Sequence, residues 1–157
     1  YLAWNREALQ TGCVNLIDVE LMAGDLIVKT LIQESHEQGV HVVVSNHDFH
    51  GTPPEPVLIN RLEKMICLGA DLPKLAVMPS GPRDVLTLLS ATEEIARRHP
   101  GIPLITMSMS GIGLVSRICG ESFGSAITFG SAGRASAPGQ IPADALKEIL
   151  HILHENR

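Results

Sequence analysis

The sequence has few aromatic residues, no excess of positive charge and no long apolar run. Only 3% of the residues are aromatic, and 12 basic residues stand against 17 acidic ones. A base-stacking platform or a basic stripe for a phosphate backbone is therefore not expected. No apolar run approaches the roughly 20 residues that span a bilayer. We therefore expect neither nucleic acid nor a membrane as a partner.

Cysteines are also scarce. The three that occur, Cys13, Cys67 and Cys119, are odd in number and far apart in the sequence. Neither a disulfide framework nor the ligand spacing of a zinc site is predicted from them. We expect reduced thiols in a cytoplasmic protein, with no bound metal.

What is present is the composition of a folded chain, with 45% hydrophobic and 18% charged residues in 157. That length is typical of one domain, so residues 1–157 are predicted to form a single domain. Tyr1 opens directly into a helical pattern that Gly12 closes, and no basic segment precedes an apolar one as in a signal peptide. A start inside a helix suggests the C-terminal part of a longer chain.

Short apolar runs alternate with longer amphipathic segments along the whole sequence. The runs predict buried strands at 15–21, 40–45, 74–78, 103–109 and 125–129. The segments predict helices at 1–12, 25–38, from about 55 to 68, 82–98, 113–119 and 142–154. This alternation is typical of βαβ units around a parallel sheet. It fits either a five-stranded doubly wound sheet or the later part of an eight-stranded barrel.

In both architectures the chemistry belongs at the carboxyl ends of the strands. Asp18 and Glu20 are two positions apart, hence on one face of the first expected strand. They either take part in the chemistry or meet a cation or water at the strand end. His47 follows a rigid apolar strand and suits a general acid or base. His47 and His50 could instead bind a metal, although their spacing suits a helix better than a strand exit, and a structural histidine is a third possibility.

Lys74 is the most informative residue, because lysine is rare inside a buried strand. Desolvation favours the neutral amine, which can attack a carbonyl group and form a Schiff base. The alternative is a lysine at the solvent end of the strand, which either extends its ammonium into water or forms an ion pair with Asp71.

Further candidates lie after the last two expected strands. Gly111 and Gly113 match a dinucleotide fingerprint only weakly, because Ser116 occupies its third glycine position. Arg117 either holds a carboxylate through its forked guanidinium or is an ordinary surface arginine. The small-residue loop 130–140 either approaches a ligand or is a plain connection.

Four segments taken together resemble one enzyme family. They are Ser45-Asn46-His47-Asp48-Phe49-His50, Pro73-Lys74-Leu75-Ala76-Val77-Met78-Pro79, Ser116-Arg117 and Ala135-Ser136-Ala137-Pro138-Gly139-Gln140. In order and spacing the chain resembles type I 3-dehydroquinate dehydratase from end to end. That family is a (β/α)8 barrel of the shikimate pathway, usually homodimeric, which works without metal or dissociable cofactor. The resemblance implies a partial barrel of about five parallel βα units, counted as strands four to eight.

The resemblance also implies the site. Lys74 would be the Schiff-base lysine and His47 the general acid/base, while Arg117, Ser136 and Gln140 would bind 3-dehydroquinate. Met109 and Phe129 match apolar positions that wall the family's pocket, and Asp18 and Glu20 match acidic positions of its fourth strand. The carboxylate and arginines that the family draws from its first three strands have no counterpart here.

Two functions follow as expectations. The first is the syn elimination of water from 3-dehydroquinate through a lysine Schiff base. The alternative is a non-catalytic ligand-binding or regulatory protein on the same fold.

Overall fold

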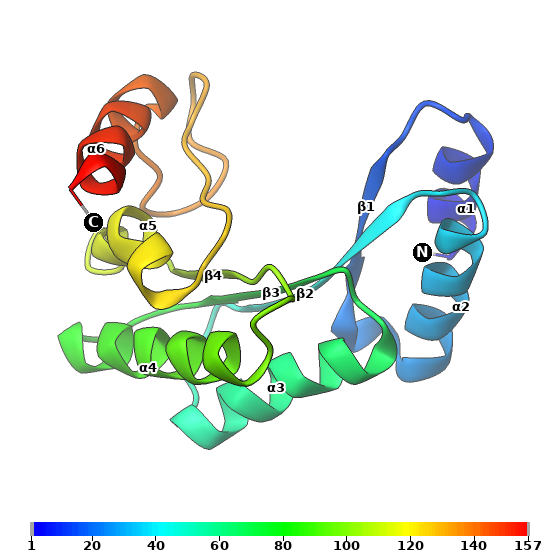
Figure 1. Ribbon diagram of the computed structural model, residues 1–157, viewed down its shortest axis with the longest axis horizontal. Coiled ribbons are helices and arrows are strands. Elements are labelled where there is room, and N and C mark those ends of the chain that lie inside the picture. The colour runs from blue at the N-terminus through cyan, green and yellow to red at the C-terminus, as the bar shows by residue number, and fades with distance from the viewer. Residues whose placement is uncertain (1, 157) are drawn as a thin grey trace.

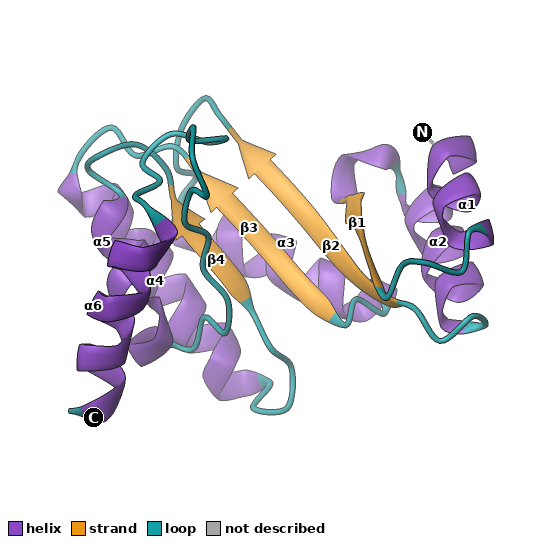
Figure 2. Cartoon of the chain, turned by 90° about the horizontal axis from the view of Figure 1, so that it is seen from above, coloured by secondary structure: helices purple, strands orange, loops and turns teal. Residues whose placement is uncertain are grey.

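The computed structural model describes residues 2–156, which form one parallel sheet with helices packed along it (Figures 1 and 2). The strands are β1 (Leu16–Glu20), β2 (His41–Asp48), β3 (Leu72–Val77) and β4 (Ile105–Ser108). The α-helices are α1 (Leu2–Gln10), α2 (Asp25–His36), α3 (Glu55–Leu68), α4 (Pro82–Arg98), α5 (Leu114–Cys119) and α6 (Ala143–Glu155). Two short 3-10 helices, η1 (Leu21–Ala23) and η2 (Gly120–Phe123), complete the elements. Tyr1, where the first helix was expected to begin, lies outside the described residues.

The strands follow one another across the sheet in the order β1-β2-β3-β4, and every pair is parallel. Helices α2, α3 and α4 pack on one face, and the sheet curves so that β1 is turned away from β4 (Figure 1). Sequential order with helices on one side of a curved sheet is the arrangement of part of an α/β barrel. A doubly wound sheet would reverse its strand order, so that alternative is wrong.

Two hydrophobic clusters follow from the alternation of side chains along each strand. The larger joins the helices to alternate strand residues, among them Ile17, Val19, Val42, Val44, Leu75 and Val77. The smaller lies on the opposite, inner face and contains Val43, Ala76, Ile105, Met107 and Met109. The polar residues of the same parity as this second set therefore also face inward.

Glycine and proline mark the ends of helices α3 and α4, as the sequence predicts. Gly69 closes α3 in the left-handed conformation, with φ of 102°, and its N–H bonds to the Ile66 carbonyl. Pro82 begins α4, where its missing N–H costs no hydrogen bond.

The prediction of a fifth strand at 125–129 is wrong. Ser125 forms a single parallel bridge with Leu104, and no strand follows it in the described residues. The Thr106 N–H donates to the Ser125 hydroxyl at 3.0 Å. Because this side chain takes the donor that a neighbouring carbonyl would use, the ladder stops after one bridge. Ala126 and Ile127 beyond it are exposed, unlike residues of a strand covered on both faces.

Asp71 ties three elements together at the amino ends of β2 and β3. Its Oδ2 lies 2.8 Å from His36 Nε2 and accepts the Val42 N–H at 2.7 Å, and its Oδ1 lies 3.4 Å from His41 Nδ1. Burial raises the pKa of Asp71, but the hydrogen bonds from His36, Val42 and His41 outweigh burial and hold that pKa below its ordinary value.

We expect Asp71→Asn to lower the free energy of unfolding at pH 7 by about 1 kcal/mol. A carboxyl whose pKa is depressed on folding stabilises the protein above its ordinary pKa, about 3.9. That contribution is lost as the pH falls further, so the deficit of the variant should shrink between about pH 5 and pH 2. Urea unfolding at several pH values measures it. The matched control is Asp25→Asn, which removes an exposed ion pair with Lys64 and should change little. An equal deficit for Asp71→Asn at all pH values would contradict this assignment.

Candidate active site

A row of polar side chains crosses the inner face of the sheet. Glu20 on β1 is the register partner of Ser45 on β2, and Ser45 is the register partner of Lys74 on β3. Two residues nearer the carboxyl ends of β2 and β3, His47 is paired with Ala76. Residues directly paired in a parallel sheet share a face and lie about 4.8 Å apart. The register alone therefore brings these side chains together.

Lys74 lies in this row with its side chain only 14% exposed. Its Nζ lies 2.8 Å from Asp18 Oδ2 and 5.4 Å from the centre of the Phe129 ring. A carboxylate and the face of an aromatic ring are both groups that attract a cation. The expected alternative, an ion pair with Asp71, is wrong, because Asp71 lies at the amino ends of the strands with His36 and His41.

His47 is oriented by Glu20. Glu20 Oε1 lies 3.0 Å from His47 Nδ1 and accepts the His47 backbone N–H at 3.2 Å. Burial raises the pKa of Glu20, but the hydrogen bonds from His47 and Ser45 outweigh burial and lower it, so Glu20 is a carboxylate. A carboxylate accepts a hydrogen bond from Nδ1–H, which leaves Nε2 with the lone pair in the neutral ring. The ring of Phe49 stacks on the imidazole at 6.0 Å between centroids.

Arg117 on α5 is the largest fully buried side chain of the described residues, with 1% exposure. Its guanidinium donates to two backbone carbonyls, Phe129 O at 3.5 Å and Pro138 O at 3.3 Å, and contacts Met107 Sδ at 3.4 Å. Within residues 2–156 no carboxylate forms an ion pair with it, and burial lowers its pKa. It is not an ordinary surface arginine. A buried cation without an anion is costly, which points to an anionic ligand.

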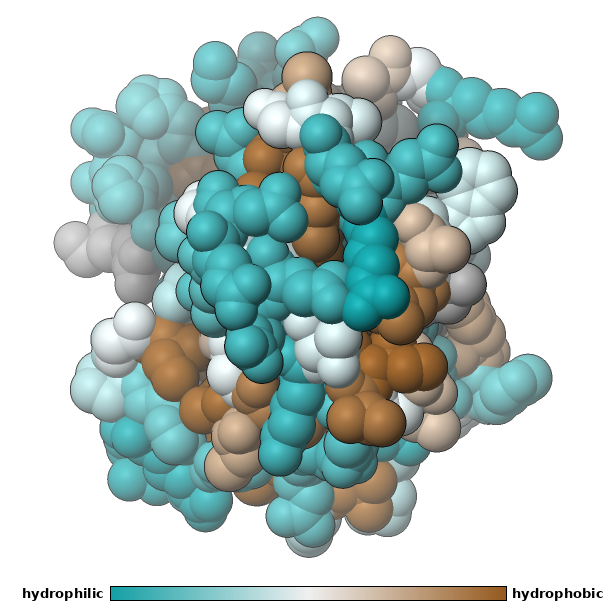
Figure 3. Space-filling model, turned by 90° about the vertical axis from the view of Figure 1, so that its right-hand side faces the viewer, coloured by the Kyte–Doolittle hydropathy of each residue, from teal (hydrophilic) through white to brown (hydrophobic). Residues whose placement is uncertain are grey.

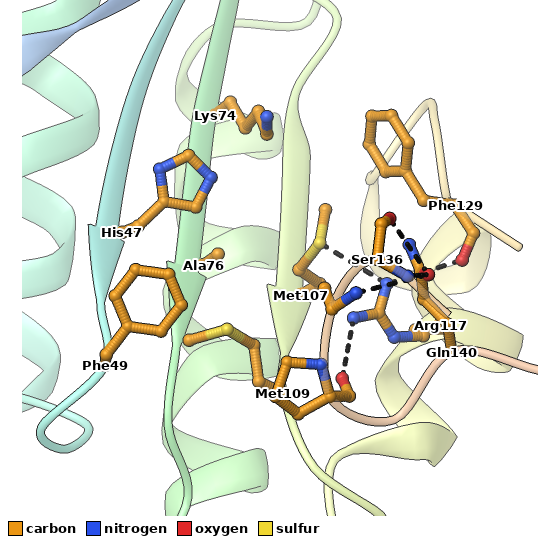
Figure 4. Close-up of a pocket in the computed structure, with 12 residues that line it drawn as sticks. His47, Phe49, Lys74, Ala76, Met107, Met109, Arg117, Phe129, Ser136 and Gln140 are labelled. Carbon is orange, nitrogen blue, oxygen red and sulfur yellow. Dashed lines mark hydrogen bonds between the residues drawn. The ribbon is translucent and has the colours of Figure 1, made fainter. Parts of the chain in front are cut away.

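The loop after residue 130 lies across the cavity from the strands (Figure 4). Gln140 Oε1 accepts the Ser136 N–H at 2.8 Å, the Ser136 hydroxyl at 3.1 Å and the Ala137 N–H at 3.3 Å. Gly139 has φ of 77°, and a Cβ there would lie 2.1 Å from Ser110 O, so only glycine fits.

A cavity of about 270 Å³ lies between the strands and this loop (Figure 4). It joins the expected site residues His47, Lys74, Met109, Arg117, Phe129, Ser136 and Gln140. The placement of Lys74 in the same cavity as His47 and Arg117 is as expected. Phe49, Ala76 and Met107 also line it and were not predicted as lining residues; the period-two pattern of β3 and β4 could have indicated Ala76 and Met107.

The described residues offer little support for the metal alternative. His47 is engaged with Glu20 and His50 is exposed. Among residues 2–156 no group of three His, Cys, Asp or Glu side chains is placed to hold a metal ion. None of the helices in the same stretch has the length and apolar character that a membrane span requires.

Comparison with known proteins agrees with this geometry. The family model described as type I 3-dehydroquinase matches residues 1–157. The chain is 54% identical to a 3-dehydroquinate dehydratase of Clostridium botulinum over 156 residues, which are 99% of this chain and 61% of that protein. It is 50% identical to the one of Clostridioides difficile, again over 99% of this chain and 61% of that protein. The chain thus spans about three fifths of the length of these relatives.

Solved structures show the same relation. A type I 3-dehydroquinate dehydratase from Clostridium difficile, described as carrying covalently modified comenic acid, superposes with a TM-score of 0.95 at 50% identity. The match covers 100% of this chain and 62% of that one. A 3-dehydroquinate dehydratase from Geobacillus kaustophilus gives 0.89 at 45% identity, over 94% and 56% of the two chains. With its parallel βα units and the family match along its whole length, the chain belongs to the type I 3-dehydroquinase family.

Proposed function

We propose that this chain carries the reacting groups of a 3-dehydroquinate dehydratase, a hydro-lyase of the shikimate pathway, on a single domain of residues 1–157. The observation that carries the proposal is the pairing of a nearly buried amine with an anchored imidazole at one cavity. Lys74 is the nucleophile and His47 the proton carrier. Family membership and the names of the relatives supply the substrate.

Lys74 condenses with the C3 ketone of 3-dehydroquinate once its ammonium has given up a proton. The resulting iminium withdraws the electrons left behind when the C2 proton departs. His47 Nε2 takes that proton, because Nδ1 is held by Glu20, and returns it to the C1 hydroxyl, which leaves as water. This syn elimination gives 3-dehydroshikimate, and hydrolysis of the imine frees Lys74.

Arg117, Ser136 and Gln140 bind the substrate in this scheme. The buried Arg117 guanidinium lacks an anion among the described residues, and the carboxylate of 3-dehydroquinate supplies one. Ser136 and Gln140 already bond to each other in the loop that faces Lys74 and His47 across the cavity (Figure 4). They offer hydroxyl and amide groups to the hydroxyls of the substrate.

We expect Lys74→Ala to abolish the adduct that borohydride traps on incubation with 3-dehydroquinate, as read by mass spectrometry. We expect His47→Ala to form the adduct slowly and to lose turnover, because nucleophile and proton carrier act at different steps. Lys64→Ala is the control, since Lys64 forms an ion pair with Asp25 on the helices. Unchanged turnover in His47→Ala would remove the proton-transfer role. Ligand binding without any adduct in the unmodified chain would favour the alternative of a non-catalytic binding protein.

We expect Arg117→Met to raise the dissociation constant for 3-dehydroquinate by about thirtyfold or more, since truncating one side of a buried charge pair costs roughly 2–5 kcal/mol. The same variant should keep or increase its melting temperature, because it removes a buried charge that has no anion beside it among the described residues. Calorimetry and thermal unfolding measure the two effects. Arg83→Met, at an exposed position of α4, is the control and should change neither. Tight binding by Arg117→Met would refute the carboxylate contact.

We propose further that the protein is a cytoplasmic homo-oligomer. Three free thiols and a biosynthetic reaction favour the cytoplasm. The outer edge of β1 pairs with no strand of the described residues, and β1 contains neither lysine nor proline to discourage pairing. Trp4 in α1, Met22 in η1 and Leu26 in α2 are exposed. Figure 3 views the molecule from the side of α1 and α2 and shows apolar residues among polar ones on that face.

We expect light scattering to give the mass of a dimer or larger assembly. Leu16→Lys places a charge at the half-exposed first residue of β1 and should shift the population toward the monomer. Leu86→Lys, which changes a 64% exposed leucine on α4, should not. A monodisperse monomer for the unmodified chain would contradict the proposal.

A further inference from the structure

The Ser45 hydroxyl lies between two carboxylates. Its Oγ is 2.5 Å from Asp18 Oδ1 and 2.8 Å from Glu20 Oε2, and the residue is 1% exposed. A serine hydroxyl carries one proton, so it can donate to only one of the two at a time. Toward the other carboxylate it presents lone pairs.

The two carboxylates serve different reacting groups. Asp18 holds the Lys74 ammonium through its second oxygen, at 2.8 Å, and Glu20 holds His47 Nδ1 through its second oxygen, at 3.0 Å. Lys74, Asp18, Ser45, Glu20 and His47 thus form one continuous chain of hydrogen bonds. Ser45 is the midpoint of this chain. Its hydroxyl carries no charge, so it can donate in either direction along the chain.

We propose that Ser45 is a positioning residue whose single proton turns between Asp18 and Glu20, and so links the charge of Lys74 to the hydrogen bond that orients His47. This proposal rests on the proposed function, which gives Lys74 and His47 their roles. Its physical basis is that a carboxylate already accepting one strong donor is a weaker acceptor for the next.

Two states follow. While Lys74 is an ammonium or an iminium, its cation satisfies Asp18, and Ser45 donates to Glu20. Glu20 then holds Nδ1–H less strongly. When Lys74 becomes the neutral nucleophile, Asp18 loses its cation, Ser45 turns to Asp18, and Glu20 holds Nδ1–H more strongly. The strength of the hydrogen bond at His47 Nδ1 thereby depends on the charge of Lys74 through the orientation of Ser45, and not only through the direct field of that charge.

The test is a mutant cycle read by the imidazole ¹⁵N shifts of His47, recorded on the full chain without substrate. Lys74→Met stands for loss of the cation. With Ser45 present, we expect this change to move the Nδ1 shift toward a stronger hydrogen bond. In a Ser45→Ala background the same change should have less than half of that effect, because only the direct field of the charge remains. Equal effects in the two backgrounds would overturn the link.

Asp18→Asn provides a second perturbation should Lys74→Met fold poorly. This substitution replaces the carboxylate that competes for the Ser45 proton with a neutral amide, so Ser45 stays on Glu20 and the Nδ1 shift stays near its value in the unmodified chain. A shift toward a stronger hydrogen bond would overturn the link. Ser45→Thr keeps a hydroxyl at a strand position that suits a β-branched residue and should restore the coupling. Ser108→Ala removes a buried strand hydroxyl without a partner in the described residues and should leave it intact.

These outcomes are separate from the proposed function. A chain that forms no adduct with 3-dehydroquinate but shows the coupling would refute the dehydratase and keep the link. A chain that turns over substrate with equal shifts in both backgrounds would refute the link alone.

Discussion

A parallel sheet puts every second side chain of a strand on the same face, and its register decides which of them meet. Here that constraint aligns Glu20, Ser45 and Lys74 in one row across β1, β2 and β3, with His47 one step beyond. The apolar residues of opposite parity pack against α2, α3 and α4 and hold the register in place. A slip of one residue in β3 would turn Lys74 toward those helices and Leu75 toward the cavity. The site thus depends on the outer core as much as on its own polar contacts.

Charge is distributed unevenly around the cavity. On the side of the strands, the two carboxylates of Asp18 and Glu20 lie near a single lysine, Lys74. On the other side of the cavity, Arg117 has a positive charge and no anion beside it among the described residues. In the proposed function, an anionic substrate with its carboxylate at Arg117 would balance one side and present its other end to Lys74. Charges buried in this way cost free energy in the unliganded protein. Stability alone does not explain them, whereas the orientation of a ligand in the proposed function would.

Much of the fold could be predicted, because β1 to β4 and the helices follow apolar periodicity and glycine or proline punctuation. The prediction of a strand at 125–129 fails for a physical reason. The Thr106 N–H donates to the Ser125 side chain and not to a backbone carbonyl, and no pattern of hydrophobicity reveals this. For the site, parity placed Asp18 and Glu20 together, the end of an apolar strand indicated His47, and the rarity of lysine inside a buried strand indicated Lys74. The partner of Lys74 could not be predicted, since Asp71 is nearer in sequence and Asp18 is nearer only through the diagonal geometry of three strands. Family resemblance, not periodicity, indicated Ser136 and Gln140.

The position of Arg117 shows how a short helix can still present a rigid cation. Helix α5 has only six residues and no side-chain cap, so by itself it fixes little. The loop beyond it supplies the missing constraint, because the Pro138 carbonyl accepts from the guanidinium and Gly139 packs directly on the Ser110 backbone. Ser136 and Gln140 lie in the same loop and bond to each other. The loop therefore orders the arginine and its own polar groups together, so a ligand that meets all three does not have to order them separately.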